Sequence, residues 1–114
     1  MKRFEDLLVW QKAQGLYLEL YAKYADSKNF FFRDQLLRAG LSISNNRAEG
    51  YERMSDKEFR YFLFVAKGSC GEVRSMLYLA EQQGEIYPEE LNDLVTHCLE
   101  ISKMIGGLIK RMEI

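Results

Sequence analysis

The sequence of 114 residues contains one proline, one histidine and two cysteines, and its charges nearly balance. A β-sandwich needs turn-forming residues every ~8–12 positions, so the single proline argues against one. The net charge of −1 excludes a uniformly basic surface of the kind that binds nucleic-acid backbones without selectivity. No uncharged stretch approaches the ~20 residues of a membrane-spanning helix, and no N-terminal signal pattern is present. We therefore expect a cytoplasmic protein without a membrane partner.

The composition is that of an ordinary globular protein. Hydrophobic residues make up 47% of the chain and charged residues 29%, so a disordered tail or a low-complexity scaffold is excluded. A chain of this length has material for one hydrophobic core. We expect residues 1–114 to form a single domain.

Apolar residues recur at spacings of three and four in four segments, which is the pattern of amphipathic helices. The pattern predicts helices over residues 6–25, 28–49, 56–83 and 88–112. Connections of a few residues make neighbouring helices antiparallel. The predicted fold class is therefore all-α, an antiparallel up-down-up-down four-helix bundle.

Local signals set the expected helix ends. Asp26 and Ser27 offer an N-cap for the second helix, and Gly50 suits the left-handed position that ends it. Ser55 and Glu58 form a capping box, with Met54 and Phe59 placed to staple the start of the third helix. Gly84 is expected to close the third helix, and Pro88 to open the fourth. The small residues at 39–44 and 68–71 predict close approaches between helices.

The sequence offers little for catalysis or metal binding. His97 and Cys98 are adjacent and lie about 100° apart on a helix, so they cannot hold one metal ion from a common face. Cys70 and Cys98 fall within apolar helical patterns, which predicts two free, buried thiols. We expect no enzyme activity, no metal and no cofactor.

Polar residues gather on the second predicted helix. The residues that share one helical face or lie at its margin are Gln35, Arg38, Ser42, Asn46 and Glu49. Glu72 on the predicted third helix is a candidate ionic partner for Arg38. One interpretation is a hydrogen-bonded seam between helices or subunits. The alternative is a ligand face, with RNA phosphates held by Arg38, Arg47 and Arg53. Residues 28–48 carry four positive charges and one negative charge, a net of +3, enough for a local phosphate contact.

Three blocks of the sequence form a recognisable pattern. They are Asp6-Leu7-Leu8-Val9-Trp10-Gln11-Lys12-Ala13, the segment from Gln35-Leu36-Leu37-Arg38-Ala39-Gly40 through Leu41-Ser42-Ile43-Ser44-Asn45-Asn46-Arg47-Ala48-Glu49-Gly50, and Glu58-Phe59 with Ala66-Lys67-Gly68-Ser69. In these blocks the chain resembles a known family, the small bacterial four-helix-bundle proteins also called the 23S rRNA intervening-sequence protein family. Arg47 stands where the family pattern usually has an aliphatic residue, and Ser44 where proline is frequent.

The resemblance implies an antiparallel bundle that assembles into a homopentamer, and it implies no established catalytic activity. The accessory proteins of diversity-generating retroelements are more distantly similar, and they bind nucleic acid and a reverse transcriptase. Fourteen Phe and Tyr residues are also many for one small core, which favours subunit contacts. We therefore expect a homo-oligomeric, pentameric scaffold or adaptor. The alternative is an RNA-associated protein, with RNA or a nucleic-acid enzyme as partner.

Overall fold

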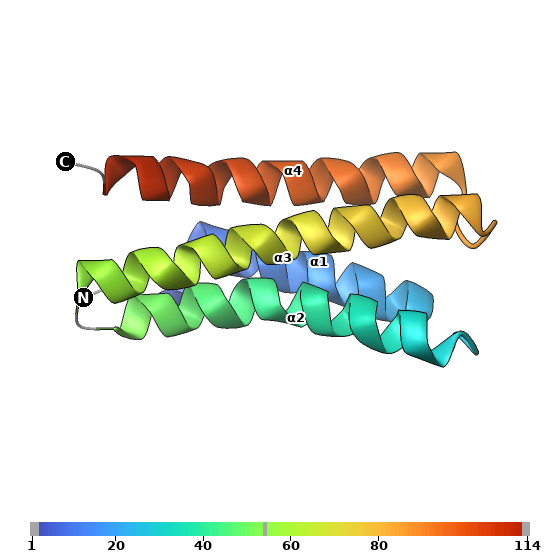
Figure 1. Cartoon of the computed structure of the whole chain (residues 1–114), viewed down its shortest axis with the longest axis horizontal. Helices are drawn as coiled ribbons and strands as arrows, with labels where there is room; N and C mark the ends of the chain where they lie inside the picture. The colour runs from blue at the N-terminus through green and yellow to red at the C-terminus, as the bar shows by residue number, and fades with distance from the viewer. Residues whose placement is uncertain (1–2, 54, 113–114) are drawn as a thin grey trace.

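The chain folds as four long antiparallel helices, shown in a computed structural model that describes residues 3–53 and 55–112 (Figure 1). After a short 3-10 turn, η1 (Phe4–Asp6), come α1 (Leu8–Tyr24), α2 (Phe30–Glu52), α3 (Asp56–Gln82) and α4 (Pro88–Arg111). They make a rod of 45 × 22 × 21 Å. Within these residues there is no strand, so the predicted all-α up-down-up-down bundle is confirmed.

Three of the five helix boundaries that we predicted from local signals are confirmed. The Ser55 hydroxyl accepts a hydrogen bond from the Glu58 amide at 3.1 Å and starts α3. Gly84 has a φ of +73°, and the Glu85 amide reaches back to the Ala80 carbonyl at 2.9 Å, so the left-handed glycine closes α3. The predicted staple between Met54 and Phe59 involves a residue outside the described ranges. Pro88 begins α4 as expected.

The predicted cap of α2 is wrong, because the helix starts later than Lys28. The residue at the N-cap is Asn29, and the Ser27 hydroxyl accepts from the Asn29 amide at 3.1 Å. Ser27 therefore stabilises the turn between α1 and α2 and does not cap an amide inside the helix.

The predicted end of α2 at Gly50 is also wrong. Gly50 is buried and helical, and α2 continues to Glu52. A Cβ added at Gly50 would lie 3.0 Å from the Phe62 Cβ and 3.3 Å from the Phe59 carbonyl oxygen. The missing side chain thus serves close packing of α2 on α3, while the backbone needs no left-handed conformation there.

Glycines predicted to allow close helix approach do so at one place and not at the other. A Cβ at Gly40 would stand 2.9 Å from Leu20 Cδ1, so α1 and α2 meet closely there, as expected. At Gly68 and Gly71 an added Cβ would meet no atom within 4 Å. The predicted crossing at residues 68–71 is absent within the described chain, because both glycines face outward on α3.

The core runs the length of the rod and contains side chains from every long helix. Among its fully buried members are Leu16 and Leu20 of α1, Leu36 and Ile43 of α2, Leu63, Val73 and Leu77 of α3, and Ile101 and Ile105 of α4. Cys70 and Cys98 are free and buried in it, as predicted. Burial raises the pKa of Cys70 to about 11 and that of Cys98 to about 12, so both stay protonated near neutral pH. No helix among the described residues is long and apolar enough to cross a bilayer.

Candidate functional site

The polar face of α2 lies partly inside the seam between α2 and α3. The Asn46 side-chain amide donates to the Ser42 hydroxyl and to the Ser42 carbonyl, both at 2.8 Å. Across the seam, the Ser69 hydroxyl lies 2.9 Å from the Ser42 hydroxyl and 3.1 Å from the Val65 carbonyl. The Ser42–Ser69 hydrogen bond therefore joins α2 to α3, while Asn46 bonds Ser42 within α2.

The other members of the predicted polar face lie outside this network. Arg38, Glu49 and Glu72 are exposed, and Gln35 is half-buried. Because Ser42 meets Ser69 in an antiparallel pair, Arg38 and Glu72 lie at a similar level along the rod. No ion pair joins them, and Arg38 has no hydrogen-bond or ionic partner among residues 3–53 and 55–112.

The three arginines considered for phosphate contact occupy different environments. Arg38 is exposed. Arg53 forms ion pairs with Glu49 at 3.4 Å and with Glu58 at 3.8 Å, and its guanidinium lies over the Phe62 ring. Arg47 is only 4% exposed, so it is buried at the end of the bundle. The structure does not bring these arginines together as one basic patch.

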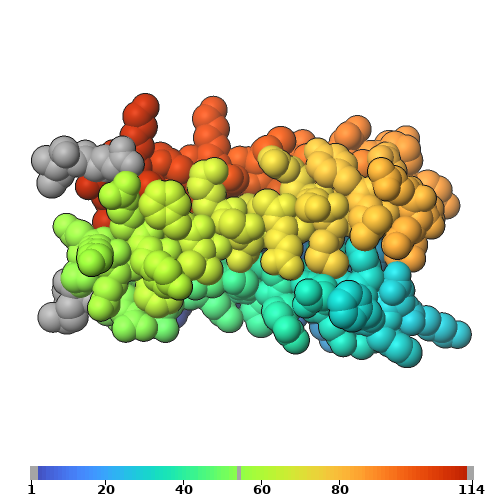
Figure 2. All heavy atoms as spheres, in the orientation of Figure 1, coloured from blue at the N-terminus to red at the C-terminus, as the bar shows by residue number. Residues whose placement is uncertain are grey.

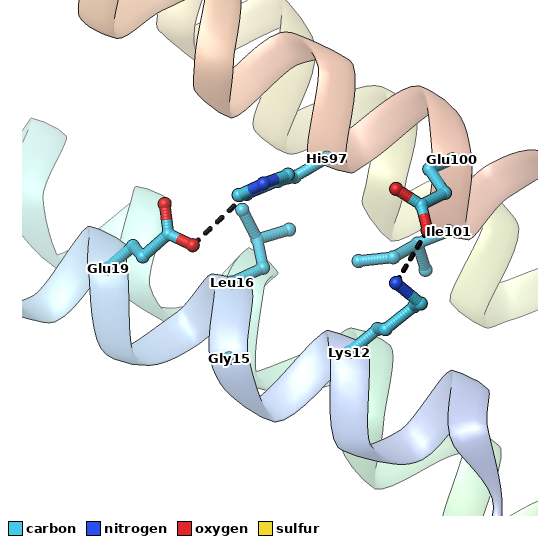
Figure 3. Close-up of a pocket in the computed structure, with 7 residues that line it drawn as sticks. All are labelled: Lys12, Gly15, Leu16, Glu19, His97, Glu100 and Ile101. Carbon is cyan, nitrogen blue, oxygen red and sulfur yellow. Dashed lines mark ion pairs between the residues drawn. The ribbon is translucent and has the colours of Figure 1, made fainter.

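A shallow hollow of about 220 Å³ lies between α1 and α4 (Figure 3). Two ion pairs cross it. Lys12 Nζ lies 2.6 Å from Glu100 Oε1, and His97 Nδ1 lies 3.0 Å from Glu19 Oε1. The hydrogen bond from Lys12 lowers the pKa of Glu100. Both pairs join partly exposed side chains, so they align α1 with α4 and contribute modestly to stability.

The hollow lacks a hydroxyl or thiol nucleophile beside its histidine. His97 with an orienting carboxylate needs a nucleophile, and the lining residues include no serine, threonine or cysteine. Within the part of the chain that the structure describes, no group of three His, Cys, Asp or Glu residues is placed to hold a metal ion. The remaining walls are Leu16, Ile101 and Gly15.

The outward face of α3 carries an uncharged row that the sequence reading did not single out. It contains residues at spacings of three and four, hereafter the outer row: Tyr61, Phe64, Gly68, Gly71, Ser75 and Tyr78. All six are exposed, with Tyr61 at 63%, Phe64 at 50% and Tyr78 at 46%. Figure 2 shows this helix, coloured green to yellow, running along the middle of the visible face.

An uncharged row of this kind is unusual on a solvent-facing helix surface, which is normally polar and charged. It spans about 26 Å at 1.5 Å per residue. Sequence periodicity alone could have found it, because the row repeats in the same 3-and-4 pattern as the core face of α3, on the opposite side.

Two further polar contacts also escaped prediction. Ser44 is fully buried, and the Gln14 side-chain amide donates to its hydroxyl at 2.9 Å, joining α1 to α2. Ser69 contributes to the α2–α3 seam from a position that periodicity assigns to the core. A serine at a core position signals a hydrogen-bonding partner on a facing helix, although the partner is not named by the sequence.

Comparisons with known proteins agree with the fold. The sequence model of the 23S rRNA-intervening sequence protein family matches residues 5–107. A crystal structure of a protein of unknown function from the S23 ribosomal protein family of Bacteroides thetaiotaomicron VPI-5482 is similar, with a TM-score of 0.86 and 25% identity. The similarity covers 90% of this chain and 99% of that one. None of the curated proteins compared matches the chain.

Proposed function

The chain belongs to the 23S rRNA-intervening sequence protein family, and we propose that it is a non-enzymatic, cytoplasmic homo-oligomer, built from five subunits, that acts as a scaffold. The observation that carries this proposal is the outer row of α3. The number five comes from the resemblance described above. A scaffold role fits a chain in which polar contacts such as Ser42–Ser69, Gln14–Ser44 and Lys12–Glu100 join its helices.

The outer row has the properties of a helix-packing surface. Tyr61, Phe64 and Tyr78 supply aromatic area, and Gly68 and Gly71 add no side chain between them. Aromatic residues are enriched at protein interfaces, and small residues let two helices approach closely. Contiguous apolar surface on a soluble protein marks a contact site, because covering it removes that surface from water.

Substitution of Gly68 and Gly71 tests whether the outer row is the interface, because an added side chain at either position meets open space within the subunit. We expect the wild-type chain to sediment as an oligomer at about 10 µM, where a typical specific interface is occupied. Gly68→Lys and Gly71→Lys place a long charged side chain in the middle of the outer row, so both should shift the mass to that of a monomer. Each subunit should keep its helical circular dichroism, because lysine favours helix more than glycine does.

Gly15→Lys is the matched control. Gly15 lies in α1, and a Cβ there also meets nothing within 4 Å, so the substitution makes the same chemical change on another surface. This variant should keep the wild-type mass. A monomeric wild type would overturn the proposal, and equal masses for the Gly68, Gly71 and Gly15 variants would remove the outer row as the interface.

Association with RNA is a second candidate, favoured by the family's description and by the exposed, unpaired Arg38. An oligomer would repeat this arginine around its surface, and repeated weak phosphate contacts add up. Arg38→Ala should then lose RNA retention at low salt while keeping the oligomer mass. Absence of RNA binding by the wild type at low salt would reject this candidate and leave the scaffold proposal untouched.

A further inference from the structure

A groove opens at the end of the bundle where α1 begins and α2 and α4 end. Its volume is about 410 Å³. The start of α1 and the last turns of α4 supply the uncharged lining residues, which are Leu7, Leu8, Val9, Met104, Gly107 and Leu108. Three cations complete the lining: Arg47, Lys103 and Arg111. No carboxylate of the described residues lines it.

Arg47 is the unusual member of this lining. It is 96% buried, since only 4% of its surface is exposed, and its Nε and Nη1 atoms have no hydrogen-bond partner. Its guanidinium lies 5.2 Å from the centre of the Phe59 ring and 6.0 Å from that of Tyr51. The faces of the two rings attract the positive charge, but they accept no hydrogen bonds from the N–H groups at the edge of the guanidinium.

An unpartnered buried cation is costly, and buried charges in proteins normally have a counter-ion. Among residues 3–53 and 55–112, no carboxylate lies within ion-pair distance of Arg47. Burial also lowers the pKa of the Arg47 guanidinium, which reports the same desolvation. Within the part of the chain that the structure describes, Arg47 thus lines the groove as a cation without a counter-ion.

The surroundings fit an anion with an aliphatic part. Lys103, Gly107 and Arg111 follow one another at spacings of four on α4, so the two cations lie on either side of a residue without a side chain. A Cβ at Gly107 would lie 3.7 Å from Arg111 Nη1 and would meet nothing closer. Leu8, Met104 and Leu108 supply apolar contact, and Leu8 is 55% exposed.

We propose that this groove binds an aliphatic carboxylate, whose headgroup pairs with Arg47 and whose chain lies against Leu8, Met104 and Leu108. Arginine binds carboxylates strongly because its planar N–H donors match the two oxygens. Lys103 and Arg111 raise the local concentration of anions at the entrance. The site is independent of the outer row of α3, so it stands whether or not the chain assembles.

Calorimetric titration with octanoate tests the proposal on the whole chain. Wild type should bind octanoate, and 1-octanol, acetate and inorganic phosphate should each bind at least about tenfold more weakly, because each lacks the charge or the chain. Arg47→Met should weaken octanoate binding by at least about tenfold, which is the scale of one charge-assisted pair. Gly107→Leu should do the same by filling the groove, and it keeps all three cations.

Arg38→Met is the control, because it removes the same charge from an exposed position on the same helix. It should bind octanoate as the wild type does. Should Arg47→Met fail to fold, as judged by circular dichroism, Gly107→Leu decides the question alone. No octanoate binding by the wild type, equal binding by the Gly107 variant, or phosphate binding as tight as octanoate would overturn the proposal.

Discussion

Gly50 of α2 lies so close to Phe62 of α3 that a Cβ at the glycine would stand 3.0 Å from the Cβ of Phe62. A contact this short is tighter than most real Cβ contacts, so Phe62 would have to shift by a few tenths of an ångström to admit even a methyl group. The distance between α2 and α3 at this end of the rod is therefore set by the absence of one side chain. The same close approach brings Phe59 over Arg47.

We expect Gly50→Ala to lower the free energy of unfolding by about 1–3 kcal/mol, the usual cost of overpacking a core. Gly15→Ala is the matched substitution at an open helical position, and it should raise stability by about 0.5–1 kcal/mol, since alanine favours helix. Urea unfolding followed by circular dichroism measures both. Equal effects of the two substitutions would show that the α2–α3 spacing does not depend on Gly50.

The hydroxyl pair of Ser42 and Ser69 should make the two residues energetically dependent on each other. Each single substitution, Ser42→Ala or Ser69→Ala, should cost about 0.5–1.5 kcal/mol, the net worth of a hydrogen bond. The double variant should cost less than the sum, with a coupling of about 0.5–1 kcal/mol. A double-mutant cycle by urea unfolding measures it, and strict additivity would contradict the contact.

Tyr24 should make the free energy of unfolding depend on pH in the alkaline range. Burial, with Glu85 and Glu90 adding to it, raises the pKa of the Tyr24 phenol from 10.0 to about 12. The folded state therefore holds the proton more tightly than the unfolded state, so this contribution is complete below pH 10 and is lost as pH rises toward 12. Thermal unfolding measured across that range should show the decline.

The Tyr24 hydroxyl is buried without a hydrogen-bond partner among the described residues. Tyr24→Phe should therefore keep or raise stability at neutral pH by up to about 1 kcal/mol, because it removes an unsatisfied polar group. The same variant should lose less stability than the wild type between pH 10 and 12. A large loss at neutral pH would mean that the hydroxyl has a partner after all.

Cys70 and Cys98 should be inert in the folded protein. Both are nearly fully buried and both thiols have raised pKa values, so neither access nor thiolate is available to a disulfide reagent. We expect no reaction with Ellman's reagent at about pH 8, and release of two thiols per chain after unfolding. Rapid reaction of either thiol with Ellman's reagent in the folded protein would indicate that α3 and α4 separate readily near these cysteines.

Much of the fold could be predicted from local sequence because local energetics define it. The periodicity that predicts the helix around Leu63, Val73 and Leu77 is the one that buries them, and Ser55 and Gly84 end α3 through contacts within a few residues. Gly50 failed as an indicator because a glycine that ends a helix and one that admits a neighbour look alike in sequence. Only the position of Phe62 distinguishes them.

The sequence by itself determined four amphipathic helices, their order, most of their ends and two buried thiols, since these follow from residue spacing and capping chemistry. The tertiary structure decided what each polar residue meets. It placed Ser42 against Ser69, left Arg38 exposed, and buried Arg47 with unpaired donors beside an apolar groove. Such pairings join residues far apart in the chain, and helix rotation and spacing, which local sequence does not fix, select among them.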